Sequence, residues 1–420
     1  MMTANDWWGV PITVINIIVF AYFVVVNTTY LLLFSAAFVS ARGYVRRRRA
    51  VDLGEVFRSP LTPMISVVIP AFNEEASIVE VVRAALLLRY PRFEVVVVND
   101  GSSDRTLSLL VDSYDLKVVT KAVECSVECS EITAVYVSGA HDNLVVIDTA
   151  HSGKADSLNA GINVSRGEIL CMVDADSLIE QDALLKVARP FLDSPRETVA
   201  VGGVIRVVNG CDVSGGRVEK VRLPGGFWAN VQLIEYLRAF LGGRMGLASL
   251  RSLLIVPGAF GAFDRRTLVE LGGYDTTTVG EDMELVLRIH RQCRRARRKY
   301  RIWYIPDPVC WTDVPVHWKQ VARQRDRWQR GLLESMRTHE DMLMNPRYGV
   351  VGLASMPFHF FFEMLGPLVE LGGYIVVFLA YFLGVLAVGY LYLFLMVAVL
   401  YGIIISMLGI ALEGVVLGRY

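Results

Sequence analysis

The sequence predicts an α/β fold with a largely parallel mixed sheet, flanked at both ends of the chain by transmembrane helices. Three observations point to this fold. Short runs rich in Val and Ile alternate with helical patterns in the middle of the 420 residues, polar residues follow several of these runs, and both ends of the chain are apolar and nearly uncharged. Strands that alternate with helices of this length are typical of a mostly parallel sheet covered on both faces.

The N-terminal segment, residues 1–41, predicts a transmembrane helix. It contains one charged side chain and an uncharged run from Val10 to Val39. As a helix, this run would be about 45 Å long, which exceeds the roughly 30 Å hydrocarbon core of a bilayer. A signal peptide would begin with basic residues and have a shorter apolar run. Arginines follow the run instead, in a basic linker over residues 42–63, so the positive-inside rule places the next module in the cytoplasm.

The C-terminal region, residues 348–420, is the second apolar segment and contains only four charged side chains. Two runs, near 366–387 and 389–414, are predicted to span the membrane. The preceding stretch, 349–365, has Pro, His and Glu residues among its aromatic residues, so we expect an interfacial or cavity-facing helix there. The sequence therefore predicts a multi-pass protein of the plasma (inner) membrane.

Charge and cysteine content limit the possible functions. The chain has 42 basic and 42 acidic residues and a net charge of zero, which argues against a nucleic-acid partner. Without the two ends, residues 42–347 have three more basic than acidic side chains. The six cysteines lie in the module assigned to the cytoplasm, where thiols stay reduced, and their spacing does not form a zinc motif.

The middle module shows alternating strand and helix patterns. We expect strands at Ile65–Pro70, Glu94–Asn99, Asn143–Asp148, Ile169–Asp174 and Val199–Val208. We expect helices at Glu74–Arg89, Lys154–Val164 and Gln181–Phe191. Ligands of such sheets bind at the carboxyl ends of the strands. Neither a GxGxxG nor a P-loop motif follows a strand, so a Rossmann cofactor site and a P-loop are not predicted.

Polar and acidic residues follow four of the predicted strands. A single acidic residue in this position usually caps a helix or forms a turn, and we interpret Asp104 in this way. Asp174 and Asp176 are two residues apart on an extended segment, so their carboxylates face the same side. Paired carboxylates without His or Cys suit Mg²⁺ or Mn²⁺ shared with substrate phosphates, and Lys154 can act as a point charge against a phosphate.

Seven motifs occur in order along the chain. They are SVVIPAFNE at 66–74, NDGSSD at 99–104, GKADSLNAG at 153–161, VDAD at 173–176, PGAFGAF at 257–263, GED at 280–282 and QRDRW at 324–328. Together they resemble the membrane-embedded branch of the family 2 glycosyltransferases, which includes the synthases of cellulose, hyaluronan and poly-N-acetylglucosamine. The resemblance implies a Rossmann-like GT-A domain at 64–316 and an amphipathic interface helix at 317–347.

The resemblance also implies a role for each motif. The uracil and ribose of a UDP-sugar would be held by Ala71, Asn73, Glu74 and Asp100. Lys154 and Asp174 would contact the rest of the donor, and Asp176 would bind Mn²⁺ or Mg²⁺ between its phosphates. Asp282 corresponds to the catalytic base of the family. An acidic first helical turn that complements the helix dipole explains Glu281 better than Asp282. The family usually has TED, and Gly280 replaces the Thr here.

Gln324, Arg327 and Trp328 form a QxxRW motif on a predicted helix, whose spacing puts Gln324 near the other two. The resemblance implies that the arginine neutralises the UDP pyrophosphate and that the indole stacks on the acceptor sugar. By itself, an amphipathic helix rich in Arg and Trp is more typical of a membrane surface, and both roles are compatible. The run from Arg288 to Arg301 has eight Lys or Arg and no acid, and we interpret it as a solvated face near anionic lipid headgroups.

The motifs imply an inverting, processive transferase that moves a sugar from a UDP-sugar to a growing glycan and extrudes the product through the membrane. Two alternatives stay open. The acceptor could be a lipid that receives a single sugar, as in the ceramide glucosyltransferases, or the chain could be a transporter or receptor with a degenerate nucleotide-binding domain. The sequence predicts neither the sugar nor the protein partners, and it assigns no role to the segments 115–142 and 209–226.

Overall fold

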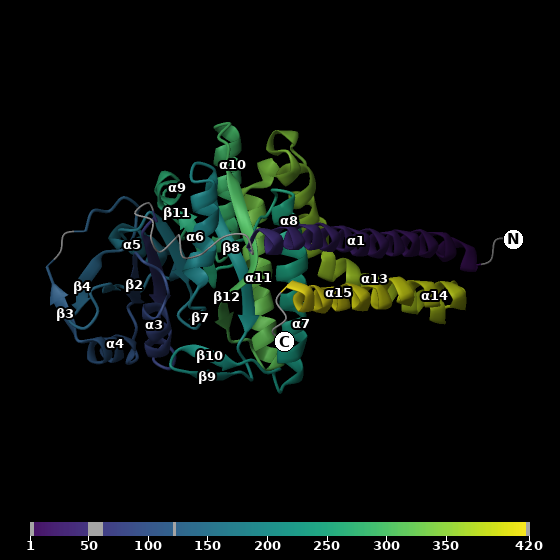
Figure 1. Ribbon diagram of the computed structural model, residues 1–420. Helices are drawn as coiled ribbons and strands as arrows, with labels where there is room; N and C mark the ends of the chain where they lie inside the picture. Colours follow the sequence, from purple (N-terminus) through teal and green to yellow (C-terminus); the bar gives the residue numbers. More distant parts are fainter. Residues whose placement is uncertain (1–3, 49–61, 121–122, 417–420) are drawn as a thin grey trace.

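A mixed sheet of ten strands forms the centre of the molecule, and long apolar helices extend from one side of it (Figure 1). The computed structural model describes residues 4–48, 62–120 and 123–416. The strands lie in the order β3-β4-β5-β2-β1-β6-β11-β8-β12-β7. The predicted α/β fold is confirmed, because β5, β2, β1 and β6 are parallel neighbours, and β8 and β12 are parallel as well.

The first half of the sheet contains four of the predicted strands. They are β1 (Ile65–Ala71), β2 (Phe93–Asp100), β5 (Leu144–Thr149) and β6 (Ile169–Val173). The neighbouring helices are α3 (Ile78–Leu86), α4 (Thr106–Tyr114), α5 (Lys154–Val164) and α6 (Ala183–Asp193). Asn99 pairs with Ala71 on one side and with Asp148 on the other, so the carboxyl ends of β1, β2 and β5 share one edge. The polar residues that follow these strands are thereby brought together.

The second half of the sheet contains β7 (Leu178–Ile179), β8 (Thr198–Val207), β11 (Phe260–Asp264) and β12 (Arg301–Thr312). Of these, the sequence predicts only β8, whose ten residues are all buried. β11 runs antiparallel between β6 and β8. β12 contains Pro306 and Pro308, and its register with β8 shifts around Pro308. Proline cannot donate a backbone hydrogen bond to a neighbouring strand, which explains why the sequence does not predict a strand here.

Two segments that the sequence leaves unassigned also form strands. Residues 115–142 include β3 (Leu116–Val119) and β4 (Ile132–Ser138), which extend the sheet antiparallel beyond β5. Residues 209–226 include a separate hairpin of β9 (Asp212–Ser214) and β10 (Arg217–Lys220). Gly215 and Gly216 form its turn at positive φ, a conformation that glycine adopts without steric cost.

The second half of the chain also contains a series of helices. They are α7 (Phe227–Leu237), the π-helix η1 (Arg238–Arg244), α8 (Met245–Ser249), α9 (Arg265–Glu270), α10 (Glu281–Arg295) and α11 (Trp318–Thr338). Two 3-10 turns follow, η2 (Glu340–Met342) and η3 (Pro346–Tyr348). The predicted helix with the QxxRW motif is therefore α11, which begins at Trp318.

Within the described residues, two helical segments are long and apolar enough to cross a membrane. One is 10–46 in α1 (Ala4–Arg48), and the other is 388–414, which comprises α14 (Val388–Leu395), η6 (Met396–Leu400) and most of α15 (Tyr401–Val416). The predicted span near 366–387 contains α13 (Gly366–Phe382), a helix of 17 residues. A bend of 49° joins α13 to 351–364, and the bent pair would count as a third span.

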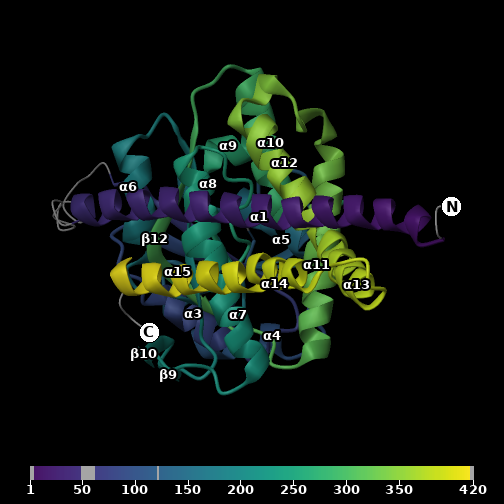
Figure 2. The same ribbon diagram turned by 90° about the vertical axis from the view of Figure 1, so that its right-hand side faces the viewer.

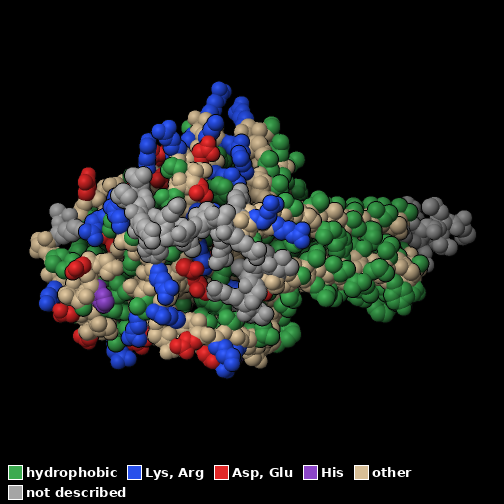
Figure 3. Space-filling model, viewed as in Figure 1, with side chains coloured by type: hydrophobic (Ala, Val, Ile, Leu, Met, Phe, Trp, Pro, Cys, Tyr) green, Lys and Arg blue, Asp and Glu red, His purple; other side chains and the backbone are tan. Residues whose placement is uncertain are grey.

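Residues 351–364, where we expect an interfacial or cavity-facing helix, are helical throughout. They form η4 (Val351–Ser355), α12 (Met356–Phe358) and η5 (His359–Met364). α1 packs against α13 and α15, and Figures 1 and 2 show α1 and α15 side by side. Their outer surface is apolar (Figure 3), with Ile17 58%, Leu368 71% and Ile403 50% exposed. Contact with hydrocarbon would remove this surface from water.

Buried contacts join the sheet to the helices of the candidate membrane spans, hereafter the membrane-type helices. Arg206 of β8 forms an ion pair of 2.5 Å with Glu413 of α15, and both side chains are almost fully buried. α8 approaches α1 so closely that a Cβ on Gly246 would lie 2.5 Å from the carbonyl oxygen of Leu33. The apolar helices are therefore packed onto the domain that contains the mixed sheet rather than tethered beside it.

We predict that Glu413→Leu lowers the free energy of unfolding by about 3–5 kcal/mol, because it leaves the buried charge of Arg206 without this carboxylate. The double variant Arg206→Met with Glu413→Leu should lose less, since it leaves neither charge. Asp212→Asn, in the exposed pair with Arg222, is the control and should change stability by less than about 1 kcal/mol. The free energy of unfolding of these three variants is measured in detergent micelles. Equal losses in the single and double Glu413 variants would contradict the prediction.

Candidate active site

Asp100, at the carboxyl end of β2, holds the loop between β5 and α5. One carboxylate oxygen accepts the backbone N–H of Ser152 at 2.8 Å, and the other accepts that of Gly153 at 3.0 Å. The second oxygen also lies 2.9 Å from Nδ1 of His151. The structure thus places Asp100 in the predicted site and uses its carboxylate to position the backbone before Lys154.

Asn73 follows β1 and connects it to the segment after β2. Its side-chain oxygen accepts the backbone N–H of Ser103 at 2.8 Å, and its own N–H donates to Ser102 Oγ at 3.0 Å. Its φ of 55° is left-handed, which Asn tolerates better than most residues. Asp104 accepts the N–H of Thr106, two residues on, at 2.9 Å, as in a turn before α4, whose N-cap residue is Arg105.

Ala71 and Glu74 lie on either side of an exposed aromatic ring. Ala71 ends β1 and is buried, and the N–H of Glu74 donates to Thr106 Oγ1 at 2.8 Å. Between them, Phe72 stacks on His151 with ring centroids 4.0 Å apart, and 42% of Phe72 remains exposed. The sequence reading missed this pair, because the two residues are far apart in the chain and neither has a distinctive spacing.

Lys154 links the acidic residues of two elements. It is the first residue of α5, and its Nζ lies 2.6 Å from Oδ1 of Asp174 after β6 and 3.2 Å from Oε1 of Glu281 on α10. Burial alone would lower the pKa of Lys154, but the charges of these two carboxylates outweigh it and raise the pKa. Lys154 therefore stays cationic, and Glu281 belongs to the site rather than only to the helix dipole.

Asp176 lies beside this cluster and is exposed. Partial desolvation, with the charges of Asp174 and Glu74, raises the pKa of Asp176 to about 6. Within the described part of the chain, no three His, Cys, Asp or Glu side chains gather closely enough to hold a metal ion by themselves. Mg²⁺ is commonly held by one or two carboxylates together with water and substrate phosphates, and the pair Asp174 and Asp176 fits that donor set.

Asp282 lies in the first turn of α10, beside the loop before β11. Its Oδ2 accepts the backbone N–H of Gly258 at 3.2 Å, and its Oδ1 accepts that of Met283 at 2.8 Å. Burial and the charge of Glu281 raise the pKa of Asp282, against the opposing charges of Lys154 and Arg244. A general base works best with a pKa nearer the working pH than an ordinary aspartate has.

Gly258 is the residue around which these groups converge. A Cβ at this position would lie 3.1 Å from Nζ of Lys154, 3.6 Å from Oδ2 of Asp282 and 3.7 Å from Oε1 of Glu281. A side chain would fill the space between the cation and the carboxylates, so the glycine of the PGAFGAF motif keeps the site open.

The helix that carries the QxxRW motif packs against the start of the helix that carries Asp282. A Cβ on Gly280 would lie 2.7 Å from the carbonyl oxygen of Gly331, so α10 and α11 touch where the GED motif begins. The family's usual Thr would not fit here without a backbone shift. Arg327 and Trp328 are exposed, and Gln324 is partly exposed. Among the described residues, no recorded hydrogen bond or ion pair joins these three to Lys154 or the acidic cluster.

The neighbours of the QxxRW motif include an ion pair that the sequence reading missed. Arg325 binds Glu235 of α7 at 2.5 Å, and its guanidinium carbon lies 4.3 Å from the ring centroid of Trp328. Arg244 of η1 was missed as well. It contributes positive charge near Asp282, and its guanidinium carbon lies 4.3 Å from the ring centroid of Phe240.

The mixed sheet, the antiparallel β11 and the acidic pair after β6 define a GT-A fold. Residues 63–331 match the family described as "Glycosyltransferase like family 2", and the chain belongs to this family. The expected family is thereby confirmed. The two candidate membrane helices agree with its membrane-embedded branch.

Named relatives and a solved structure extend this comparison. The chain is 30% identical over 276 residues to "Probable glycosyltransferase YdaM" of Bacillus subtilis (strain 168), covering 64% of this chain and 55% of the relative. It is 27% identical over 267 residues to "Poly-beta-1,6-N-acetyl-D-glucosamine synthase" of Staphylococcus epidermidis, covering 64% and 54%. The chain thus spans about half the length of these curated relatives.

The fold is similar to that of the mannosyltransferase PcManGT from Pyrobaculum calidifontis, solved in complex with GDP-Man and Mn²⁺. The TM-score is 0.55 and the sequence identity 21%, and the match covers 93% of this chain and 99% of the other. At this identity the similarity supports the fold.

We predict that Gly280→Ala lowers the free energy of unfolding by about 1–3 kcal/mol, because its Cβ would press on the backbone of Gly331. Gly331→Ala, whose Cβ would lie 2.8 Å from Cα of Gly280, should have a similar effect. Gly225→Ala is the matched control, because no atom lies within 4 Å of its Cβ position. Thermal unfolding compares the three variants, and a Gly280→Ala protein as stable as the control would contradict the close contact.

Proposed function

We propose that the protein is an inverting, processive glycosyltransferase that moves a sugar from a UDP-sugar to a growing polysaccharide. One observation carries this proposal. Lys154 joins Asp174 of the DxD pair to Glu281, next to the candidate base Asp282, at the sheet edge where ligands of such folds bind. A cation, a metal-binding pair and a base are thus available to one bound donor and acceptor.

The nucleoside of the donor would bind at the ends of β1 and β2. The exposed face of Phe72, fixed by its stacking on His151, offers a platform for the uracil ring. Ala71, Asn73, Glu74 and Asp100 would form the walls of this pocket. Asn73 and Asp100 act chiefly by positioning, because their side chains already hold the loops that would contact the ribose.

The diphosphate of the donor would lie between Lys154 and a divalent ion held by Asp176 with Asp174. Bound Mn²⁺ or Mg²⁺ would stabilise the negative charge of the departing UDP. Lys154 and Arg327 would add positive charge against the same phosphates. The exposed carboxylate of Asp176 is the available hard oxygen ligand, while Oδ1 of Asp174 is held by Lys154.

Asp282 would accept the proton of the acceptor hydroxyl as the oxygen attacks the anomeric carbon. The bond from that carbon to the UDP oxygen breaks, and its electron pair leaves with UDP. A single displacement of this kind inverts the anomeric configuration. The N–H of Gly258 and the charge of Lys154 keep the Asp282 carboxylate oriented before it takes the proton.

The acceptor would approach along α11. Trp328 is 41% exposed and can stack on a sugar, and Gln324 lies one turn away on the same helix. The poly-N-acetylglucosamine synthase relatives favour a glycan acceptor over a lipid. We propose that the chain is a multi-pass protein of the plasma membrane with the domain 64–316 in the cytoplasm. The membrane segments at 1–41 and 348–420, beside α11 in 317–347, would form the exit route, and the linker 42–63 would join them to the domain.

We predict that Asp282→Asn lowers the rate of sugar transfer by about 10²–10⁴-fold, because the amide cannot accept the proton. Binding of UDP should persist, since Asp282 does not contact the nucleoside in this assignment. Asp193→Asn, on the exposed end of α6, is the control with the same chemical change. UDP release and UDP binding are measured in parallel. Near wild-type turnover of Asp282→Asn would show that another group acts as the base.

We also predict that removal of divalent ions with EDTA stops UDP release and that Mn²⁺ or Mg²⁺ restores it. Asp176→Asn should require at least about tenfold more metal for half-maximal activity, because one of two carboxylate ligands is lost. The titration of activity with each ion measures this shift. An unchanged requirement in Asp176→Asn would place the metal elsewhere.

A further inference from the structure

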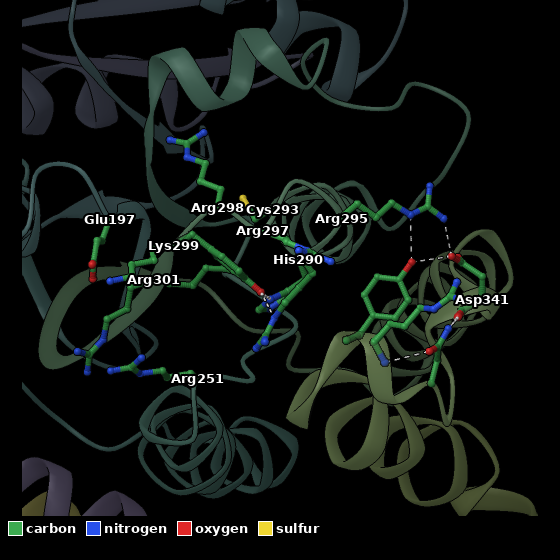
Figure 4. A pocket seen from close by; sticks show the side chains of 16 residues that line it. Glu197, Arg251, His290, Cys293, Arg295, Arg297, Arg298, Lys299, Arg301 and Asp341 are labelled. Atoms are coloured by element: carbon green, nitrogen blue, oxygen red, sulfur yellow. Dashed lines mark hydrogen bonds and ion pairs between the residues drawn. The ribbon is translucent and has the colours of Figure 1, made fainter.

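A large cavity at the far end of α10 is separate from the candidate active site. Its volume is about 1090 Å³, above the usual range of small-molecule sites of about 300–1,000 Å³. Its walls come from the end of α10 and the turn after it, the start of β12, the residue before β8, the second residue after α8, and the η2–η3 segment. Figure 4 shows the basic side chains of these elements, among them Arg251, Arg298 and Lys299. Asp282 is at the opposite end of the same helix.

The lining is strongly basic. Eight Lys or Arg side chains line the cavity with two carboxylates, Glu197 and Asp341, while Glu270 outside the lining binds Arg298 at 3.1 Å. The ends of α8 and α10 add about half a negative charge each, which leaves a net of about four positive charges. Burial lowers the pKa of His290 to about 4, so this residue adds no charge near neutral pH. The negative ends of these two helices therefore balance only part of the positive charge of the lining.

Several of these cations have no acidic partner among the residues that the structure describes. Arg295 binds Asp341 at 2.8 Å. For Arg251, Arg297, Lys299 and Arg347, the structure records no ion pair with any residue that it describes. Arg251 and Arg297 adopt left-handed φ values of 57° and 52°, where arginine is uncommon. Each follows a helix end at which glycine is the ordinary residue, so both positions keep a cation at a conformational cost.

The cavity is close to the membrane-type helices. Arg347 lies on η3, four residues before Val351, where the candidate membrane pair 351–382 begins. Arg251 follows α8, and α8 packs against α1 at Leu33, inside the candidate span 10–46. Figure 3 shows Lys and Arg side chains gathered over α10, beside the apolar helices. The cavity is thus placed to receive a ligand at the membrane surface as well as one from solution.

We propose that this cavity binds a phosphate-bearing anion. Guanidinium groups suit phosphate because their N–H groups form paired, charge-assisted hydrogen bonds with its oxygens, and several arginines around one cavity can share a ligand with more than one negative charge. The phosphate can belong to a lipid headgroup or to a soluble molecule, and the experiment separates these two sources.

The test uses the full chain in nanodiscs and the double variant Arg297→Asn with Lys299→Gln. Asn suits the left-handed backbone at 297, so this variant removes two charges without adding strain. The control is Lys117→Gln with Lys220→Gln, which removes two charges from exposed strands at other edges of the molecule (Figure 1). Thermal unfolding verifies that both variants are folded.

Two probes are compared. In nanodiscs of equal phosphatidylglycerol and phosphatidylcholine, native mass spectrometry counts the lipids that stay bound. In nanodiscs of phosphatidylcholine alone, calorimetry measures the binding of tripolyphosphate in metal-free buffer. The donor site is unchanged in both variants, so any binding there is common to the wild type, the cavity variant and the control. We expect the cavity variant to lose about tenfold or more in affinity for at least one probe, while the control keeps the wild-type value.

The pattern of loss identifies the source. A loss limited to phosphatidylglycerol assigns the cavity to a lipid headgroup, and a loss limited to tripolyphosphate assigns it to a soluble phosphate compound. If the cavity variant binds both probes as the control does, or if the wild-type protein binds neither, the proposal is wrong. Neither probe depends on sugar transfer, so this result is independent of the proposed function.

Discussion

The contact of Lys154 with two carboxylates is the interaction on which the candidate site depends. Without a cation, Asp174 and Glu281 would repel each other, and the nearby Asp176 and Asp282 would add to the repulsion. Lys154 takes its position from the start of α5, which Asp100 fixes through the backbone of Gly153. The site is still rich in negative charge, and a divalent ion would supply the positive charge that a diphosphate also needs.

A second constraint links this chemistry to the membrane-type helices. The sheet that carries the acidic residues is joined to α15 by the buried pair of Arg206 and Glu413, and α8 packs directly on α1. α10 runs from Asp282 at one end to the basic cavity at the other, and it touches α11 through Gly280. In the proposed function, the donor site, the acceptor-binding helix and the exit route would therefore belong to one packed unit.

The sequence predicts the parts of the fold that depend on local pattern. The helix Lys154–Val164 is found at its predicted boundaries, and the strands before Asp100 and Asp174 lie within two residues of those predicted. The sequence does not predict β12, because two prolines interrupt its strand pattern. The stacking of Phe72 on His151, the contact of Gly280 with Gly331 and the role of Glu281 depend on residues far apart in the chain. Spacing alone contains no signal for such contacts.

The most direct test of the central claim is the incubation of membranes that contain the protein with a panel of labelled UDP-sugars and Mn²⁺. UDP release and the size of the labelled product are measured together. We predict UDP release with a restricted set of donors and a product that is a long polymer. A product with a single sugar on a lipid would contradict processive synthesis, and no UDP release with any donor would contradict the assignment of the site itself.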